Sequence, residues 1–255
     1  MVQVIDKNFQ LHATKIPACT NGMKVFHMKG LSYVDSGLSC DTFNIIHISD
    51  GNHATNEALA GVLDYFKKHD LEYCIWVSES NKTAVLEAVF ESYFITRQGE
   101  EVGMVLDLEK YQPFYRDEYE NIRIVNSKEA LFDYANVVAS NWEPADQNVI
   151  KYYNITGSSY LDPANGIMLL VYYHDGKPVG TIEMFPSDSA TIGLYGLATI
   201  RSFRGKGIGS ALMDFALNKA KEKGYQQAVL QATEDGIGIY RKQGFVEYSK
   251  YYEYS

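Results

Sequence analysis

A glycine-rich turn in front of a predicted helix carries the residue types and spacing best suited to chemistry. Its residues are Arg204, Gly205, Lys206, Gly207, Ile208, Gly209 and Ser210. Closely spaced glycines let the backbone turn its N–H groups toward one point, because no Cβ atoms stand in the way. The N–H groups that open the helix add the positive end of its dipole. The turn is therefore predicted to hold a di-anionic pyrophosphate, with the arginine and lysine at its rim.

Three nucleotide-binding patterns compete for this turn. The Walker A pattern fails because Gly207, rather than Ser or Thr, follows Lys206. Ser210 stands where a dinucleotide-binding fingerprint needs Gly or Ala. The remaining pattern, Arg-x-x-Gly-x-Gly, is met by Arg204, Gly207 and Gly209. A turn that only caps an ordinary helix is the structural alternative.

A second motif follows further along the chain. Tyr240 precedes Gly244-Phe245, and a glycine just after an apolar periodic run is typical of a helix end. A phenol can donate a proton when it is held at hydrogen-bond distance from a leaving group. The chain has 20 tyrosines, so simple packing is the alternative for this one.

The elements that must position these motifs follow from apolar periodicity. Strands are predicted at 167–173, 179–185, 192–199, 228–231 and 245–254, and helices at 208–223 and 234–242. The order β-β-β-α-β-α-β predicts an α/β fold with a mixed sheet and helices across it.

The N-terminal half partly repeats this order. Strands are predicted at 43–48 and 71–77, helices at 56–69 and 82–93, and paired strands within 95–108. Strand-helix-strand-helix-strand then occurs twice, which indicates an internal duplication. The polar segment 109–120 is the predicted linker, so we expect domains at 1–110 and 120–255.

The first copy lacks the glycine-rich turn. Between its strand and helix stands Ser49-Asp-Gly-Asn-His-Ala54, with one glycine and no arginine. The carboxylate of Asp50 would repel a phosphate. We therefore expect no anion site in this half.

Composition sets the class of protein. The chain has 255 residues, of which 46% are hydrophobic and 22% charged, which excludes an intrinsically disordered protein. Its formal charge of −9 argues against nucleic-acid and membrane binding and slightly favours an amine or cationic peptide as partner.

Cysteine and histidine usage argues against disulfides and metals. Cys19, Cys40 and Cys74 are widely spaced without a CxxC pair, and the 6 histidines form no HExxH motif. The N-terminus shows no signal-peptide pattern, so we expect a cytoplasmic protein without a metal.

The Arg-x-x-Gly-x-Gly loop after a strand, followed by the Tyr-x-x-x-Gly-Phe helix end, resembles the GNAT superfamily of acetyl-CoA-dependent N-acetyltransferases. The resemblance covers residues 120–255. The chain also has the segments Leu197-Ala-Thr and Leu230-Gln-Ala-Thr and a long extra N-terminal half. In these features it is similar to tandem-GNAT proteins whose first copy is degenerate. This similarity implies a GNAT-like fold with two GNAT-like halves.

The resemblance also implies how a coenzyme binds. The strand before the loop would carry a bulge and splay from its parallel neighbour, and the pantetheine arm of acetyl-CoA would bond to Leu197, Ala198 and Thr199. Residues 204–210 would wrap the pyrophosphate. Thr233 stands where relatives often carry Asn, and its hydroxyl can still donate a hydrogen bond.

The implied reaction is direct attack of a primary amine on the acetyl thioester in a ternary complex. Tyr240 occupies the family's general-acid position. The strand at 192–199 has no carboxylate, so Glu183 on the neighbouring strand is the candidate base. An outward-facing role for Glu183, and a water relayed by backbone carbonyls, remain alternatives.

The function implied is acetylation of a small-molecule or protein amine. An acyl-CoA-binding sensor or scaffold without turnover is the alternative, and a nucleotide-binding enzyme using the same loop is a third hypothesis. Metals, nucleic acids and membranes are not expected as partners.

Overall fold

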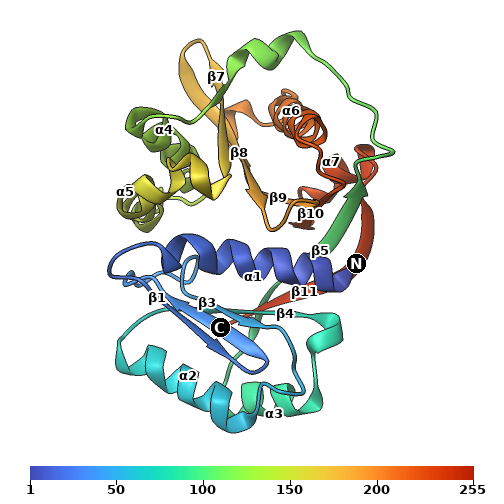
Figure 1. Cartoon of the computed structure of the whole chain (residues 1–255). Helices are drawn as coiled ribbons and strands as arrows, with labels where there is room; N and C mark the ends of the chain where they lie inside the picture. The colour runs from blue at the N-terminus through green and yellow to red at the C-terminus, as the bar shows by residue number, and fades with distance from the viewer. The chain divides into compact units, whose positions relative to one another are not determined.

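The computed structural model describes all residues 1–255, which form two compact units (Figure 1). The first unit comprises Met1–Met104, Gln231–Asp235 and Glu247–Ser255, and the second comprises Val105–Leu230 and Gly236–Val246. The last strand of the chain thus belongs to the first unit. Each compact unit is built from separate segments of the chain, whereas the expected domains 1–110 and 120–255 are each one continuous segment.

The first unit is a mixed sheet with helices. Its elements are α1 (Val2–Ala18), β1 (Lys24–Met28), β2 (Leu31–Asp35), β3 (Ile45–Ile48), α2 (Asn56–Lys68), β4 (Cys74–Ser78), α3 (Ala84–Ser92), most of β5 (Arg97–Asp107) and β11 (Val246–Tyr254). The strand order is β1-β2-β3-β4-β11-β5. Strands β3 and β4 are parallel, and β11 pairs antiparallel with β4.

Local sequence explains the helices of this unit. Thr55 and Thr83 cap α2 and α3, because their side chains accept hydrogen bonds from the third amide beyond them. The apolar residues of α2 recur at helical spacing and are buried in the core of the unit: Leu59, Val62, Leu63 and Phe66.

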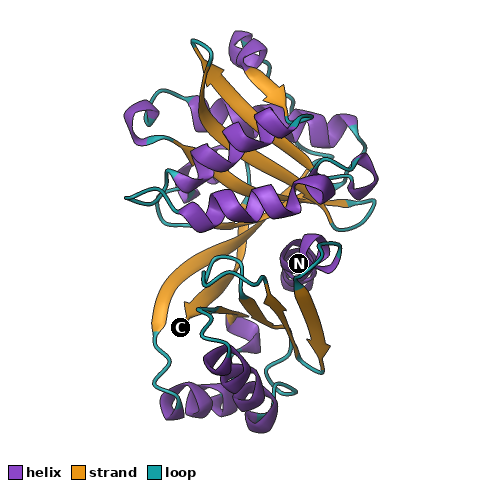
Figure 2. Cartoon of the chain, turned by 90° about the vertical axis from the view of Figure 1, so that its left-hand side faces the viewer, coloured by secondary structure: helices purple, strands orange, loops and turns teal.

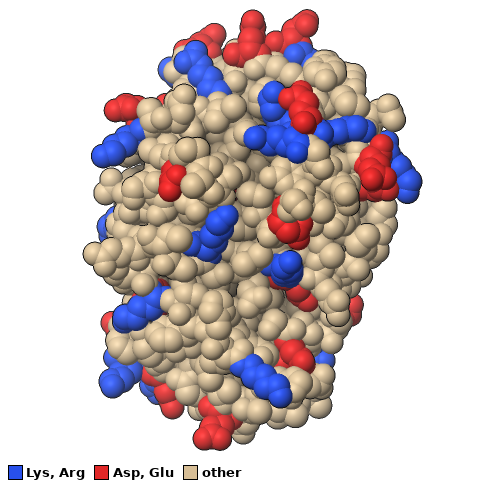
Figure 3. Space-filling view, viewed as in Figure 1, with Lys and Arg blue, Asp and Glu red and all other residues tan.

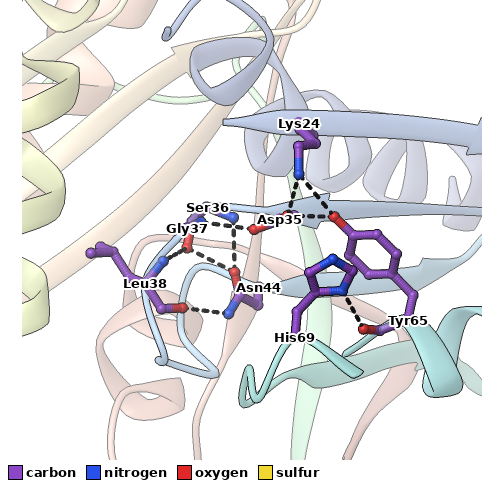
Figure 4. A network of polar contacts seen from close by, with 8 residues as sticks. All are labelled: Lys24, Asp35, Ser36, Gly37, Leu38, Asn44, Tyr65 and His69. Atoms are coloured by element: carbon purple, nitrogen blue, oxygen red, sulfur yellow. Dashed lines mark hydrogen bonds and ion pairs between the residues drawn. The ribbon is translucent and has the colours of Figure 1, made fainter. Parts of the chain in front are cut away.

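A polar network joins β1, β2 and α2 of the first unit (Figure 4). Tyr65 and Lys24 both donate to the Asp35 carboxylate, at 2.5 and 3.3 Å. Burial would raise the pKa of Asp35, but hydrogen bonds from Tyr65, Gly37 and Lys24 outweigh it and lower that pKa. These contacts hold the elements of the unit together.

The second unit carries the loop and the strands around it. Its elements are β6 (Ile122–Ile124), α4 (Lys128–Ala139), α5 (Gln147–Tyr160), β7 (Met168–His174), β8 (Lys177–Pro186), β9 (Thr191–Thr199), α6 (Ile208–Glu222), most of β10 (Gln227–Ala232) and α7 (Ile237–Lys242). The strand order is β10-β9-β8-β7-β6, and helices lie across these strands (Figure 2). Only β9 and β10 pair in parallel; the other neighbours are antiparallel.

Helices cover both faces of β8. A Cβ atom at Gly180 would lie 2.7 Å from Ile208 and 3.0 Å from Leu212, so the missing side chain lets α6 approach this face. Side chains alternate along a strand, so Thr181 and Glu183 point to the opposite face, which α4 covers.

The segment between β5 and β6 is attached to α6. Arg116 Nε donates to the buried Asp214 carboxylate at 2.6 Å, and Gln243, just after α7, donates to the other oxygen of Asp214 at 2.5 Å. Asn218 donates to the Phe114 carbonyl at 2.7 Å. The polar segment predicted as a linker is therefore fastened by charge-assisted hydrogen bonds.

Several predicted elements need correction. Residues 97–107 form one strand and not a strand pair. A Cβ atom at Gly99 would lie 2.9 Å from Glu253, and one at Gly103 would lie 2.5 Å from Tyr251. These glycines mark the close approach of β11, which the local sequence does not reveal. The helix predicted from residue 234 begins only at Ile237, and α1, β1, β2, β6, α4 and α5 were not predicted.

The strands and helix around the glycine-rich loop are confirmed, as is the mixed sheet. Acidic and basic side chains are interspersed on the face seen in Figure 3, without a continuous field of one sign. No helix is both long and apolar enough to cross a membrane.

Candidate functional site

The loop between β9 and α6 leaves a row of amide groups without partners. Gly205 and Gly207 have φ of +75° and +83°, and Gly207 caps α6 without any side-chain hydrogen bond. The structure gives no hydrogen-bond partner to the amides from Gly205 to Ser210, and bonding resumes where Ala211 donates to the Gly207 carbonyl. Such a row at a helix start is suited to bind a phosphate group.

The corresponding loop of the first unit is closed. Its amides donate to oxygens of the same unit from Ser49, Asp50, Asn52, His53, Ala54 and Thr55. His53 Nδ1 lies 2.7 Å from the Asp50 carboxylate, which gives the loop a negative group in place of an anion. This bonding supports the prediction that the first copy has no anion site, which stays a prediction.

Strand β9 contains the bulge that the family resemblance implies. Thr181 pairs with Ala198 and Glu183 with Tyr195, so two residues of β9 oppose one of β8. Within the bulge Gly196 has φ of +58°, and Thr181 Oγ1 donates to its carbonyl at 3.0 Å. Gly196 is exposed, whereas Leu194 and Ala198, two residues away on either side, are buried.

Beyond their first residues, β9 and β10 are not paired. Recorded pairs join Gln227–Val229 to Thr191–Gly193 only, although both strands continue further. In the first unit the parallel strands β3 and β4 pair along the full length of β3. Only the second unit therefore has unpaired parallel strands next to an amide-lined loop.

Helix α7 lies against the loop. A Cβ atom at Gly209 would be 3.4 Å from Ile239 Cδ1 and 4.0 Å from Thr199 Oγ1. The first turn of α6, the end of β9 and α7 therefore meet at this glycine. Tyr240, next to Ile239, is 8% exposed.

The end of α7 has a counterpart in the first unit. The Phe245 amide donates to the Tyr240 carbonyl at 3.1 Å, and the Ile95 amide donates to the Phe90 carbonyl at 2.8 Å. The residues before these amides, Gly244 and Phe94, both have positive φ, of +92° and +57°. The first copy thus keeps the helix end but has a phenylalanine where the second has the tyrosine hydroxyl.

Comparison with known proteins agrees with this geometry. Residues 128–245 match the Acetyltransferase (GNAT) family. This part of the chain is therefore similar to a GNAT domain. The family match includes the bulged strand, the loop, and α7 with Tyr240, so the family resemblance drawn from the two motifs is confirmed.

Solved structures share the fold over nearly the whole chain. A GCN5-related N-acetyltransferase from Kribbella flavida has a TM-score of 0.68 at 16% identity, covering 97% of this chain and 94% of that one. A functionally unknown conserved protein from Staphylococcus epidermidis has a TM-score of 0.66 at 19% identity, covering 92% and 94%. A tandem GNAT protein from the clavulanic acid biosynthesis pathway has a TM-score of 0.59 at 14% identity, covering 88% and 77%. The fold is therefore GNAT-like, with two GNAT-like halves.

The two cations of the loop are already engaged. In the second unit Arg204 Nε donates to the Thr199 carbonyl at 3.0 Å, and its Nη2 donates to Asn141 at 3.4 Å. Lys206 Nζ lies 4.3 Å from the centre of the Phe203 ring. Arg204 thus ties the loop to the end of β9, so the backbone amides are the groups best placed for an anion.

Glu183 is a buried carboxylate, only 2% exposed, so the outward-facing alternative is wrong. It lies beside a cluster of buried tyrosines from α4 and α5: Tyr134, Tyr152, Tyr153 and Tyr160. Burial raises the pKa of each phenol in this cluster, and the negative charge of Glu183 raises it further. These hydroxyls therefore stay protonated.

Not all predicted site residues belong to the second unit. Leu197, Ala198 and Thr199 form the end of β9 and lead into the loop. Thr233 follows β10 and belongs to the first compact unit. No group of three or more His, Cys, Asp or Glu side chains is placed to hold a metal ion.

Sequence reasoning did not find Tyr134 or Gly196. A glycine inside a strand pattern often marks a bulge, and Gly196 offered that signal. Tyr134 offered none, because its helix was not predicted.

Proposed function

We propose that this protein transfers an acetyl group from acetyl-CoA to a primary amine of a small molecule or protein. The observation that carries the proposal is the row of unpartnered amides from Gly205 to Ser210. The family match and the GNAT-like fold support acyl transfer as the class of reaction.

The residues present fit a coenzyme with a diphosphate. The loop amides and the start of α6 offer hydrogen bonds and a positive dipole end to its negative charge. The unpaired edge of β9 at Leu197, Ala198 and Thr199 offers backbone groups to an extended arm. Thr233 is a further proposed donor.

Acetyl-CoA would supply the acyl group as a thioester, whose C–S bond breaks as the amine nitrogen forms the new C–N bond. Tyr240 is the proposed acid that gives its phenolic proton to the departing sulfur. The attacking nitrogen must lose a proton, and Glu183 is the proposed acceptor. Its burial excludes bulk water, which strengthens its interaction with a positively charged nitrogen.

The proposal is tested first by binding. Acetyl-CoA should raise the melting temperature of the purified chain. Ser210→Glu places a carboxylate among the loop amides, where it suits the first turn of a helix but repels a diphosphate. This variant should remain folded and lose at least about tenfold in acetyl-CoA affinity.

A matched control adds the same negative charge to the corresponding loop of the first unit. Asn52→Glu puts a carboxylate in the closed loop of the first unit and should leave the response to acetyl-CoA unchanged. Equal binding by Ser210→Glu and the wild type would refute the loop assignment. Stabilisation by ATP or NAD but not by acetyl-CoA would instead point to a nucleotide-binding enzyme.

Turnover is tested by thiol release with spermidine, tyramine, glucosamine and a lysine peptide as acceptors. Release above the rate of acetyl-CoA hydrolysis supports the enzyme. Binding without amine-dependent release supports the sensor or scaffold. Tyr240→Phe should lower the rate of an active preparation without weakening acetyl-CoA binding.

A further inference from the structure

A buried carboxylate joins the two helices of the proposed coenzyme site. Asp214 on α6 is 1% exposed; one of its oxygens accepts a hydrogen bond from Arg116 Nε and the other accepts one from Gln243 Nε2. A buried ion pair is often no more stabilising than apolar residues of similar size. Stability alone therefore does not account for a carboxylate at this place in α6.

Helix α7, which carries Tyr240, needs support from outside. It has only six residues, its first turn contains Gly238, and its N-cap residue Gly236 provides no side-chain cap. A helix this short with a glycine in its first turn is marginal by itself. The position of α7 therefore depends on the groups that it contacts.

Two contacts with α6 hold α7, one on each side of Tyr240 along the chain (Figure 1). Near the start of α6, a Cβ atom at Gly209 would lie 3.4 Å from Ile239 Cδ1. At the other end of α7, its C-cap residue Gln243 donates to Asp214. Because α6 begins at the proposed diphosphate loop, one helix would fix both the coenzyme and the tyrosine.

The first unit has the same pair of helices without a hydroxyl to position. Its helix α3 has Phe90 where α7 has Tyr240, as the matching helix ends show. Counted from the residue that caps each helix, Asp214 on α6 corresponds to Val62 on α2, which is buried and apolar. The carboxylate thus accompanies the copy that has the tyrosine hydroxyl.

We propose that Asp214 and Gln243 are positioning residues, which hold α7 against α6 so that the Tyr240 hydroxyl stays within reach of the departing sulfur. The inference rests on the proposed function, in which Tyr240 protonates that sulfur. Proton transfer requires hydrogen-bond distance, and a displacement of about 1 Å can lower a rate by about a hundredfold. Loss of the tether should therefore slow the chemical step without loosening the coenzyme.

The test removes the hydrogen bond and keeps the length of the side chain. Gln243→Met should lower kcat for the best acceptor of the four-amine panel by about ten- to a hundredfold. The affinity for acetyl-CoA should not change. Gln243→Lys keeps a donor for the Asp214 carboxylate and should restore most of the lost kcat.

A double variant shows whether the effect passes through the tyrosine. In the Tyr240→Phe background there is no hydroxyl to position, so adding Gln243→Met should leave kcat unchanged. Asp214→Asn weakens the same hydrogen bond from the other side and should show the same dependence on the Tyr240 hydroxyl. A residue that only stabilises the fold would instead lower kcat by the same factor in both backgrounds.

Asn218→Leu is the matched control. Asn218 lies one turn further along α6, is also buried, and donates to the Phe114 carbonyl in the segment between β5 and β6. The variant therefore loses a buried hydrogen bond of α6 that does not involve α7. It should lower the melting temperature, as Gln243→Met should, but keep the wild-type kcat.

Three results would overturn the inference while leaving acetyl transfer intact. They are wild-type kcat in Gln243→Met, an equal fall of kcat when Gln243→Met is added to Tyr240→Phe, and an equal fall of kcat in Asn218→Leu. Unchanged kcat in Tyr240→Phe alone would refute the acid assignment, and this inference with it. A wild-type chain that neither binds acetyl-CoA nor accelerates any amine would refute the proposed function itself.

Discussion

The contact between Tyr134 and Gly196 can be tested by stability alone, with a double-mutant cycle. Gly196→Ala adds a Cβ atom at a residue with φ of +58°, which costs about 1–2 kcal/mol for an L side chain. The same atom would lie 2.6 Å from the Tyr134 oxygen. Crowding in a packed site adds about 1–3 kcal/mol. The single substitution should therefore lower the free energy of unfolding by about 2–5 kcal/mol.

The second arm of the cycle removes the crowding and keeps the backbone strain. Without the hydroxyl, the nearest ring atom would be Tyr134 Cζ, at 3.7 Å from the added Cβ atom, which is an ordinary contact. In the Tyr134→Phe background Gly196→Ala should therefore cost only about 1–2 kcal/mol. The cycle should give a coupling energy of about 1–3 kcal/mol, with the double variant more stable than the sum of the single effects predicts.

Urea denaturation followed by circular dichroism measures each corner of the cycle. Gly61→Ala is the control for a generic glycine-to-alanine effect, since a Cβ atom there meets nothing within 4 Å on α2, and it should gain up to about 1 kcal/mol. Additive effects of Gly196→Ala and Tyr134→Phe, within about 0.5 kcal/mol, would refute the close approach of the hydroxyl to the bulge.

Three further predictions concern stability. Burial and the neighbouring Glu253 raise the pKa of Glu101 to about 8. The folded chain then binds this proton more tightly than the unfolded chain. The free energy of unfolding should therefore fall as pH rises from about 4.5 to 8, by up to about 1.4 kcal/mol per pH unit. Urea denaturation at several pH values should show a weaker pH dependence for Glu101→Gln. Phe94 has φ of +57° and is 89% exposed; Phe94→Gly should raise the free energy of unfolding by about 0.5–1 kcal/mol, and a loss of stability would contradict the strain argument. Asp214→Asn weakens its bonds to Arg116 and Gln243 and should lower the melting temperature, with a loss of about 2 kcal/mol in chemical denaturation; an unchanged midpoint would show that this network contributes little.

The duplication of the fold could be inferred from the sequence, but the pairing of the last strand could not. The repeated strand-helix order was visible in residues 43–108 and 192–254. The pairing of β11 with β4 of the first unit was not visible, because pairing between strands far apart in the sequence produces no periodic pattern of residues in either strand. The need for glycine at residues 99 and 103 was not visible for the same reason: the side chains that approach Gly99 and Gly103 come from the distant strand β11.

The sequence by itself determined the loop from Arg204 to Ser210 and the helix end at Gly244. Both depend on local requirements: glycine where φ is positive, and free amides at the start of a helix. The residues next to each other in the sequence show these requirements directly. Only the tertiary structure decided which groups surround the β9 bulge. Tyr134, Glu183 and Gly196 come from three different elements, and burial and proximity are properties of packing that no single segment encodes.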